Sequence, residues 1–547
     1  MTDKQEYIDV STIGLDAIPP TPSPLPSASD KATVSYWLAT TPAHLLPESL
    51  DAPPSQSDVV IIGSGITGVS CALHLINSLP SSSSSLEKAE GGVRTITILE
   101  ARQFCSGATG RNGGHLTAAS ALAYTDIAAN PDHLLGQACA NFAEAQRKDA
   151  IGKAVQEILQ FEEDTANAIR RLIAQEAVEK DIGFTDEKNW HLCFTQEEVE
   201  AFEDSLAQAG EHERMKKFVD KVRRVGKEEV DSQMNHPHGV VGVFEIPGTT
   251  LHPRALVAVI YRRAERLAKQ KGINLNLVTQ CPVHSVAPTT DGSKLTTSNG
   301  AIDAGYVVHA TNGYASHLLP SLSTPTTGIT PTRAQVIALP PSSPSYLWGM
   351  GLSAGRGYEY GHQRPSPEPP LYILGGGREY APSREWGVAD DTTLNSDVSE
   401  FLHPCMGKVF PNSYGGKGVE REWTGIMGYT KTKNPIVGTI GGSMGREWIA
   451  AGYSGHGMTR AYGCAEVVAE MVMAEIDGRQ WREKGGFPDC YLTPGARAEG
   501  VEEKGELVAD GMKEKDEGMK EKDEGREKEE EEKGSSEGRS SGCCVVS

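Results

Sequence analysis

The apolar residues of this chain first gather at 58–76, in DVVIIGSGITGVSCALHLI. The run VVII before the glycines is typical of a buried strand, and the apolar residues after the glycines suit a helix. A second apolar run, TITILEA at 95–101, follows a Ser-rich low-complexity insertion and is expected to form another buried strand. Strand, turn, helix and strand in this order predict the start of a parallel α/β sheet.

The pattern of apolar and polar residues changes twice in the rest of the chain. Residues 148–178 repeat apolar side chains at helical spacing, and 194–235 have a polar, helix-favouring composition. Further on, the pattern predicts a helix at 252–271, strands near 275–279 and 283, a hairpin at 289–311, strand-like pieces within 329–410, a strand at 447–452 and a helix at 458–476. The βαβ pieces at both ends predict a nucleotide-binding domain with a second domain inserted into it.

Composition separates both ends from the rest. The N-terminal part contains IPPTPSPLPSAS and should be extended or disordered, although Tyr36 and Trp37 are expected to pin it to the body of the protein. The C-terminal part is charged and is disordered by composition. We divide the chain into a Pro/Ser-rich extension (1–55), a split nucleotide-binding domain (56–125, 249–328 and 420–495), an inserted second domain (126–248 and 329–419) and a charged tail (496–547).

Charge and targeting signals narrow the class of protein. The formal net charge of −21, without a basic stripe, argues against a nucleic-acid partner. The first residues lack a basic segment followed by an apolar core, so no secretory signal is expected. No apolar run reaches the roughly 18 residues that a membrane helix needs. The ten cysteines lack the spacing of a metal site. These features predict a cytoplasmic protein without a metal ion.

The segment GSGITG carries the first chemical signal. In a strand–turn–helix unit, Gly63 permits the tight turn, Gly65 lets the backbone approach a pyrophosphate, and Gly68 lets the helix pack on the strand. The helix N-terminus then presents N–H groups to the phosphates. Glu100, at the end of the next strand, is expected to accept the ribose hydroxyls, the alternative being an ordinary surface glutamate.

A second Gly-rich turn, GATGRNGGH at 107–115, follows Glu100 directly. A simple NAD dehydrogenase does not need such a turn. It offers further backbone donors, together with Arg111 and Asn112, along the flavin half of a dinucleotide whose adenosine half is already held. The two turns together therefore favour FAD over NAD.

These motifs, with SYW at 35–37 and AAGYSGHGMTRAYG at 450–463, resemble FAD-dependent oxidoreductases of the D-amino-acid oxidase and glycine oxidase superfamily. The likeness covers about 35–476 and lies close to the branch that contains gamma-glutamylputrescine oxidoreductase. It implies a split Rossmann-type FAD-binding domain with an inserted β-rich substrate domain. Carried over position by position, it implies that FAD is bound by Gly63, Gly65, Gly68, Glu100, Thr109, Arg111, Asn112, Gly113, Val283, Gly455, His456, Gly457 and Met458.

One departure from related enzymes concerns the attachment of the flavin. Related sarcosine oxidases bind the flavin covalently through a Cys at the place where this chain has Met427. A thioether cannot form that bond. The resemblance therefore implies FAD without a covalent link at this position.

The substrate residues are less clearly marked. In glycine oxidase-like members an Arg of the substrate domain binds the substrate carboxylate through two hydrogen bonds. Arg364, between YEYGHQ and PLYILGGG, is the first candidate for this role, the alternative being a surface Arg in a Pro-rich stretch. Tyr360, with Tyr358, either walls the substrate pocket or packs within a strand. His252, in LHP, is either a site residue or a structural histidine.

The resemblance implies that a small amine or amino acid is oxidised at its C–N bond by hydride transfer to the flavin. The imine is then hydrolysed, and oxygen is the expected acceptor. Two alternatives stay open: a tailoring oxidase of a fungal secondary-metabolite pathway, and a membrane-tethered flavin-binding protein without turnover.

The last residues, GCCVVS, end in a C-a-a-X pattern at Cys544. A final Ser favours farnesylation of that Cys. Cys543 could carry a palmitoyl chain, which would supply the second anchor that stable membrane attachment needs. A four-residue match also arises by chance. The sequence thus predicts membrane association through a lipidated C-terminus.

Overall fold

The computed structural model describes residues 21–80, 93–136, 139, 141–342, 348–365, 370–381, 383–440 and 446–497. Both of its large sheets lie within one unit that ends at Arg497. The charged tail from Ala498, with Cys543 and Cys544, lies outside the described residues. No described helix is both long enough and apolar enough to cross a membrane.

The first sheet has a parallel centre. Its order is β17 (Ile436–Thr439), β18 (Glu447–Ala451), β11 (Gly300–His309), β1 (Gln56–Ile62), β2 (Thr95–Leu99) and β8 (Asn274–Val278). Pairing is parallel from β18 to β8, and β17 is antiparallel to β18. The strands β9 (Val283–Pro288) and β10 (Ser293–Thr297) extend β11 as an antiparallel hairpin. Strands from three separate parts of the sequence therefore build one Rossmann-type sheet.

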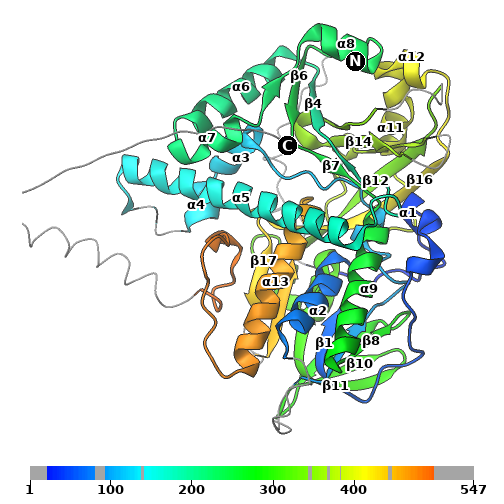
Figure 1. Cartoon of the computed structure of the whole chain (residues 1–547), viewed down its shortest axis with the longest axis vertical. Coiled ribbons are helices and arrows are strands. Elements are labelled where there is room, and N and C mark those ends of the chain that lie inside the picture. The colour runs from blue at the N-terminus through cyan, green and yellow to red at the C-terminus, as the bar shows by residue number, and fades with distance from the viewer. Residues whose placement is uncertain are drawn as a thin grey trace, which may run out of the picture. The chain divides into compact units, whose positions relative to one another are not determined.

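Helices cover this sheet because their apolar residues recur on one face. The helix α2 (Ile66–Ser78) packs between α9 (Pro253–Lys271) and α13 (Gly457–Ile476), as Figure 1 shows. The long helix α5 (Glu144–Glu176) contacts α13. Buried apolar residues of all four helices join β1 and β2 in one core. The expected α/β architecture is confirmed.

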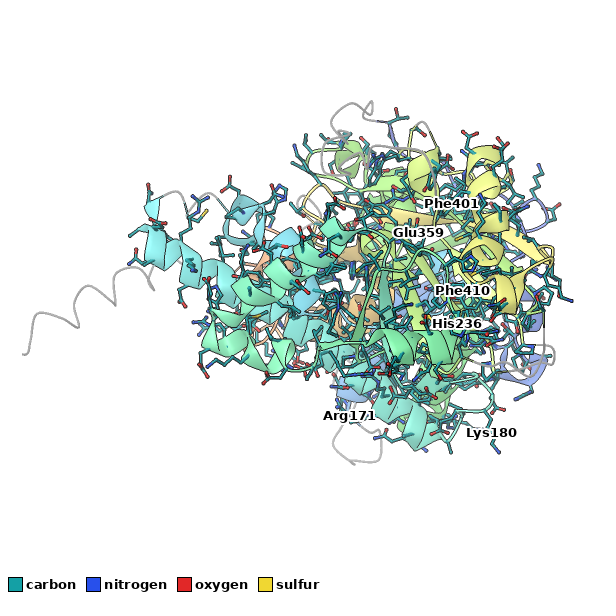
Figure 2. All side chains as sticks on the ribbon, turned by 90° about the horizontal axis from the view of Figure 1, so that it is seen from above. Arg171, Lys180, His236, Glu359, Phe401 and Phe410 are labelled. Atoms are coloured by element: carbon teal, nitrogen blue, oxygen red, sulfur yellow. The ribbon has the colours of Figure 1, made fainter. Side chains whose placement is uncertain are left out.

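The second sheet is mostly antiparallel. Its order is β16 (Arg421–Tyr429), β12 (Thr330–Leu339), β15 (Tyr372–Gly375), β14 (Glu359–Gln363), β13 (Gly351–Ala354), β4 (Asn189–Cys193), β6 (Gly242–Ile246) and β5 (Arg223–Arg224). One face packs on α11 (Ser396–Val409), and Phe401 and Phe410, labelled in Figure 2, belong to this layer. The strand β16 lies in this sheet, although we grouped 420–495 with the nucleotide-binding part.

The described part of the N-terminal extension is held against the body of the protein. Tyr36 and Trp37, on α1 (Tyr36–Thr40), are buried among residues of β12, β15 and β16, which confirms the expected pinning. The remaining short elements are α3 (Tyr124–Ala128), α4 (Pro131–Leu135), β3 (Thr185–Asp186), α6 (Gln196–Gly210), α7 (Lys216–Val219), α8 (Lys227–Met234), β7 (Thr249–Thr250), α10 (Ala315–Leu318) and α12 (Pro411–Tyr414).

Candidate cofactor and substrate site

The first Gly-rich turn joins β1 to α2. Gly63 has a φ of +113°, and a Cβ there would lie 2.6 Å from the Ala310 carbonyl oxygen. A Cβ at Gly68 would lie 1.9 Å from the Gly63 carbonyl oxygen. Gly65 precedes the first residue of α2, and no side chain caps the helix there. The turn thus brings a helix N-terminus close to the sheet, the arrangement that binds a pyrophosphate.

Glu100 follows β2 at the carboxyl edge of the first sheet. Its Oε2 accepts hydrogen bonds from the backbone N–H and the hydroxyl of Ser64, at 3.0 and 2.7 Å. Its Oε1 accepts a hydrogen bond from the Arg102 backbone N–H at 3.0 Å. These bonds fix the carboxylate beside the Gly63 turn, which suits an acceptor for ribose hydroxyls.

The N-terminal segment and β16 hold the second Gly-rich turn. Three consecutive carbonyl oxygens, those of residues 110–112, accept hydrogen bonds from the Ser35 hydroxyl and the indoles of Trp423 and Trp37, at 2.6, 2.8 and 2.6 Å respectively. Side chains from distant parts of the sequence thus set the backbone of this turn. Ser35 and Trp37 of the SYW motif therefore not only pin the N-terminal segment, as expected, but also hold this turn in place.

The guanidinium of Arg111 bonds within the protein and helps to hold the second Gly-rich turn in place. Its guanidinium donates to the carbonyl oxygens of Ser106, Thr33 and Thr424 and lies 3.5 Å from the Asp391 carboxylate. Burial lowers the pKa of Arg111 to about 10. Because its donors are used inside the protein, Arg111 orders the turn, and its neighbours Asn112 and Gly113 line the cavity.

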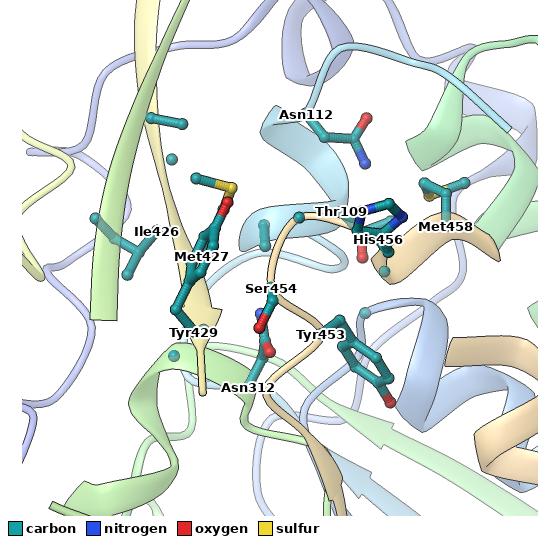
Figure 3. Close-up of a pocket in the computed structure, with 18 of the residues that line it drawn as sticks. Thr109, Asn112, Asn312, Ile426, Met427, Tyr429, Tyr453, Ser454, His456 and Met458 are labelled. Carbon is teal, nitrogen blue, oxygen red and sulfur yellow. The ribbon is translucent and has the colours of Figure 1, made fainter. Parts of the chain in front are cut away.

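The N-terminus of α13 forms another side of the site. Gly455 has a φ of +91°, and no side chain caps the helix at His456. Figure 3 shows His456 and Met458 near Thr109, with Met427 and Tyr429 on the strand across from them. The uncapped helix start brings a positive dipole end into the cavity, where it would stabilise an anionic flavin ring.

Glu162 of α5, which the sequence did not single out, anchors this helix start. Its Oε1 lies 2.7 Å from Arg460 Nε and 3.5 Å from His456 Nδ1, and its Oε2 accepts bonds from the Thr459 hydroxyl and the Ala119 N–H. Burial alone would raise the pKa of Glu162, but the charges of Arg460 and His456 hold it well below the ordinary range.

Replacing Glu162 by Gln is expected to lower the free energy of unfolding at neutral pH by about 3 kcal/mol, because Arg460 would stay buried without its counter-charge. Urea unfolding of the FAD-bound protein measures this. Since the folded-state pKa is depressed, the difference should shrink as the pH falls below about 4.3. Glu163→Gln, which loses an ion pair to Lys221 nearer the surface, is the matched control and should cost less than 1 kcal/mol. Equal stability of both variants would contradict this role.

A cavity of about 1140 Å³ connects the two sheets. It exceeds the roughly 300–1,000 Å³ of pockets for drug-sized ligands, as a dinucleotide together with a substrate requires. The predicted residues that line it are Gly63, Gly65, Glu100, Thr109, Arg111, Asn112, Gly113, Val283, Tyr360, Gly455, His456, Gly457 and Met458. Gly68 lies behind them, in contact with the Gly63 backbone.

Two of the predicted substrate residues lie outside this cavity, and their assignment is corrected. Arg364 donates to the carbonyl oxygens of Ile182 and Gly183 and stacks over Trp37, so its charge faces the interior. His252 is the N-cap of α9: its Nδ1 accepts a hydrogen bond from the Ala255 N–H, and its Nε2 lies 3.2 Å from the Thr40 hydroxyl. Both are structural residues.

Arg378 lines the cavity where Arg364 was expected to act. It is 7% exposed and lies over the rings of Tyr358, Trp386 and Tyr429, at 5.6, 4.7 and 4.9 Å from their centroids. Its hydrogen bonds, to the Tyr429 hydroxyl and the Arg384 carbonyl, are both 3.4 Å long. No carboxylate among the described residues forms an ion pair with it. Arg378 is therefore a buried cation that has no ion-pair partner in the part of the chain that the structure describes.

The split parallel sheet, the Gly63 turn, Glu100 and the long cavity define a dinucleotide-binding enzyme of the Rossmann type. Residues 58–471, more than half of the chain, match the family model "FAD dependent oxidoreductase". The chain belongs to this family, and its cofactor is FAD. The residues that line the cavity fit this cofactor, and Met427 lies among them as a side chain that cannot attach it.

Two curated relatives cover most of the chain. Gamma-glutamylputrescine oxidoreductase of Escherichia coli is 24% identical over 85% of this chain and 94% of its own length. The probable oxidoreductase OrdL of Rhizobium meliloti is 23% identical over 77% of this chain and 84% of its own length. Glycine oxidase from Geobacillus kaustophilus has a similar structure, with a TM-score of 0.56 and 17% identity over 79% of this chain and 98% of that one.

Proposed function

We propose that this protein oxidises the C–N bond of a small amino acid or of an amine that carries a carboxylate. When bound, FAD supplies the acceptor for a hydride from the carbon beside the nitrogen. Water then hydrolyses the imine, and oxygen reoxidises the cofactor. The names of two similar proteins, gamma-glutamylputrescine oxidoreductase and glycine oxidase, support a nitrogen-bearing substrate.

The observation that carries this proposal is Arg378. A buried guanidinium without a counter-charge is costly, because burial removes its hydration. The aromatic rings of Tyr358, Trp386 and Tyr429 offset part of that cost. A substrate carboxylate would supply the missing charge and accept two parallel hydrogen bonds from the guanidinium. Arg378 would thereby fix the substrate's orientation in the cavity.

The other residues near Arg378 exclude water and position the substrate. Tyr360 packs against Gly113, where a Cβ would lie 2.4 Å from its ring, and lines the cavity there. Amine oxidation on a flavin needs a neutral nitrogen and a C–H bond held at the correct distance. The aromatic walls supply an apolar surface that favours the neutral amine.

A screen for turnover tests the proposal. Peroxide release and oxygen uptake would be measured with D- and L-amino acids and with the amines that lack their carboxylates. We expect turnover of at least one amino acid and weak or no turnover of the matching amine. Turnover only with a bulky metabolite would instead favour the tailoring oxidase. Turnover with an artificial electron acceptor, but not with oxygen, would contradict oxygen as the acceptor.

From the sequence alone, we further propose that Cys544 is farnesylated and attaches a cytoplasmic enzyme to membranes, with Cys543 as a palmitoylation site. Intact mass of protein purified from its native host should show one farnesyl group, with loss of the last three residues. Cys544→Ser should abolish that shift, whereas Cys490→Ser, at a Cys within the folded part, should not. An unmodified C-terminus would contradict the attachment.

A further inference from the structure

The cavity continues beyond the strand that contacts the second Gly-rich turn. Tyr360, which packs on Gly113, lies on β14. The strands β13 and β4 follow as its next neighbours in the sheet, and Ser353 of β13 and Asn189 and His191 of β4 line the cavity there. At about 4.8 Å per strand, this region begins ~5 Å and ends ~10 Å beyond β14. Arg378, the proposed carboxylate partner, follows β15 on the opposite side of β14, so this region lies on the side of β14 away from the proposed carboxylate site.

These three side chains form a connected polar group. The Asn189 Nδ2 donates to the Ser353 hydroxyl at 2.9 Å, and that hydroxyl lies 2.9 Å from His191 Nδ1. Asn189 is 2% exposed and His191 is 7% exposed. Asn189 Oδ1 and His191 Nε2 are buried without a hydrogen-bond partner among the described residues. A buried polar atom that stays unpaired is costly, so a bound ligand group is the natural partner of each.

The charge of this region selects the kind of group that it can bind. Burial lowers the pKa of His191 to about 4, so its imidazole is neutral at physiological pH. Asn189 and Ser353 are also neutral, and the Phe202 ring lies 4.5 Å from the imidazole, edge to face. Of the acids that line the cavity, Asp126 of α3 is exposed to solvent, Glu100 lies beside the Gly63 turn, and Glu379 directly follows Arg378. An ammonium or a carboxylate would therefore lose hydration here without gaining a buried counter-charge.

We propose that Asn189, His191 and Ser353 bind a neutral hydrogen-bonding group, a carboxamide or a hydroxyl, at the end of the substrate remote from the oxidised nitrogen. This inference rests on the proposed function. It makes the substrate an elongated amine with a polar far end. Asn189 Oδ1 can only accept a hydrogen bond, so the bound group must donate one.

Four carboxylate-bearing amines of equal chain length, whose far ends are a carboxamide, a hydroxyl, a methyl or an ammonium group, would test the wild-type enzyme. We expect kcat/KM for the carboxamide or the hydroxyl to exceed that for the methyl and ammonium compounds by about 10-fold to 100-fold, mainly through KM. Equal values, or a preference for ammonium, would overturn the inference. Failure of all four compounds to reduce the flavin would count against the proposed function. Calorimetry would still measure the affinity of the protein for each of the four compounds, and so show which end group the site prefers.

His191→Phe and Asn189→Leu keep the size of each side chain and remove its polar atoms. In both variants the ratio of kcat/KM between the carboxamide- or hydroxyl-ended compound and the methyl-ended compound should fall to within about 3-fold of unity. Ser353→Ala, a smaller change that also removes a polar atom of this group, replaces either variant as the test if that variant fails to fold. His74→Phe makes the same exchange at a buried histidine of α2 that does not line the cavity, and should keep the preference. Variants of Asn189 and His191 that keep the full preference would overturn the inference.

Discussion

Replacement of Arg378 by Leu should lower kcat/KM for a carboxylate-bearing amine by about 100-fold to 1,000-fold. Truncating one partner of a buried charge pair costs roughly 2–5 kcal/mol, and about 1.4 kcal/mol corresponds to a factor of ten. FAD content should stay unchanged, because the contacts of Arg378 are with Tyr358, Trp386, Tyr429 and the Arg384 carbonyl and not with the Gly-rich turns. Steady-state kinetics and the bound flavin spectrum measure both quantities.

Two further variants separate a role in binding from a role in folding. Arg378→Lys keeps the charge but cannot donate two parallel hydrogen bonds to a carboxylate. Its kcat/KM for a carboxylate-bearing amine should therefore lie between the values for wild type and Arg378→Leu. Arg364→Leu removes an Arg that donates to main-chain carbonyls, bonds to Tyr36 and stacks on Trp37. It should lower the melting temperature without changing the ratio of kcat/KM between an amino acid and its matching amine. If Arg364→Leu changed that ratio and Arg378→Leu did not, our assignment would be reversed.

Replacement of Gly65 by Val should yield folded protein that purifies without FAD. A Cβ at Gly65 would meet one neighbour, the Thr109 hydroxyl at 3.2 Å, so the backbone tolerates it. The added methyl groups, however, would occupy the approach of the pyrophosphate to the start of α2. We expect FAD affinity to fall at least about 100-fold, which corresponds to about 3 kcal/mol. Flavin fluorescence released on denaturation measures the occupancy.

Gly226→Val provides the matched control for this change. Gly226 is likewise the N-cap of a helix, α8, and nothing lies within 4 Å of a Cβ added there. Its variant should keep a full complement of FAD and a far-ultraviolet spectrum like that of Gly65→Val. A Gly65→Val protein that retains stoichiometric FAD would show that the cofactor binds elsewhere.

The sequence could predict the cofactor half of the site because its signals are local. The turn at Gly63 needs a left-handed φ and close contact with a strand, and both requirements select glycine within a few residues. Glu100 ends the next strand of the same unit and lies beside that turn. Such short-range geometry is encoded directly in residue spacing, so the Gly63 turn, Glu100 and the first sheet follow from the pattern, whereas Val283 and residues 455–458 followed only from the family resemblance.

The substrate half could not be predicted in the same way. Arg364 directly follows β14, whereas Arg378 follows β15 and a turn at Gly377, which has a φ of +72°, and only Arg378 lines the cavity. Glu162 reaches Arg460 across almost three hundred residues, from a helix that the sequence marked only as amphipathic. Asn189 and Ser353 meet because β4 pairs in parallel with β13. Contacts between distant segments leave no local pattern.

Anaerobic titration of the FAD-bound protein with an amino acid that supports turnover tests the central claim most directly. Our account predicts that the visible absorption of the oxidised flavin is lost stoichiometrically, and that the matching amine without a carboxylate produces at most slow loss. Dithionite provides the control, since it should bleach the same flavin completely. If dithionite reduces the flavin and no amino acid or amine does so, the protein does not oxidise amines at this cavity.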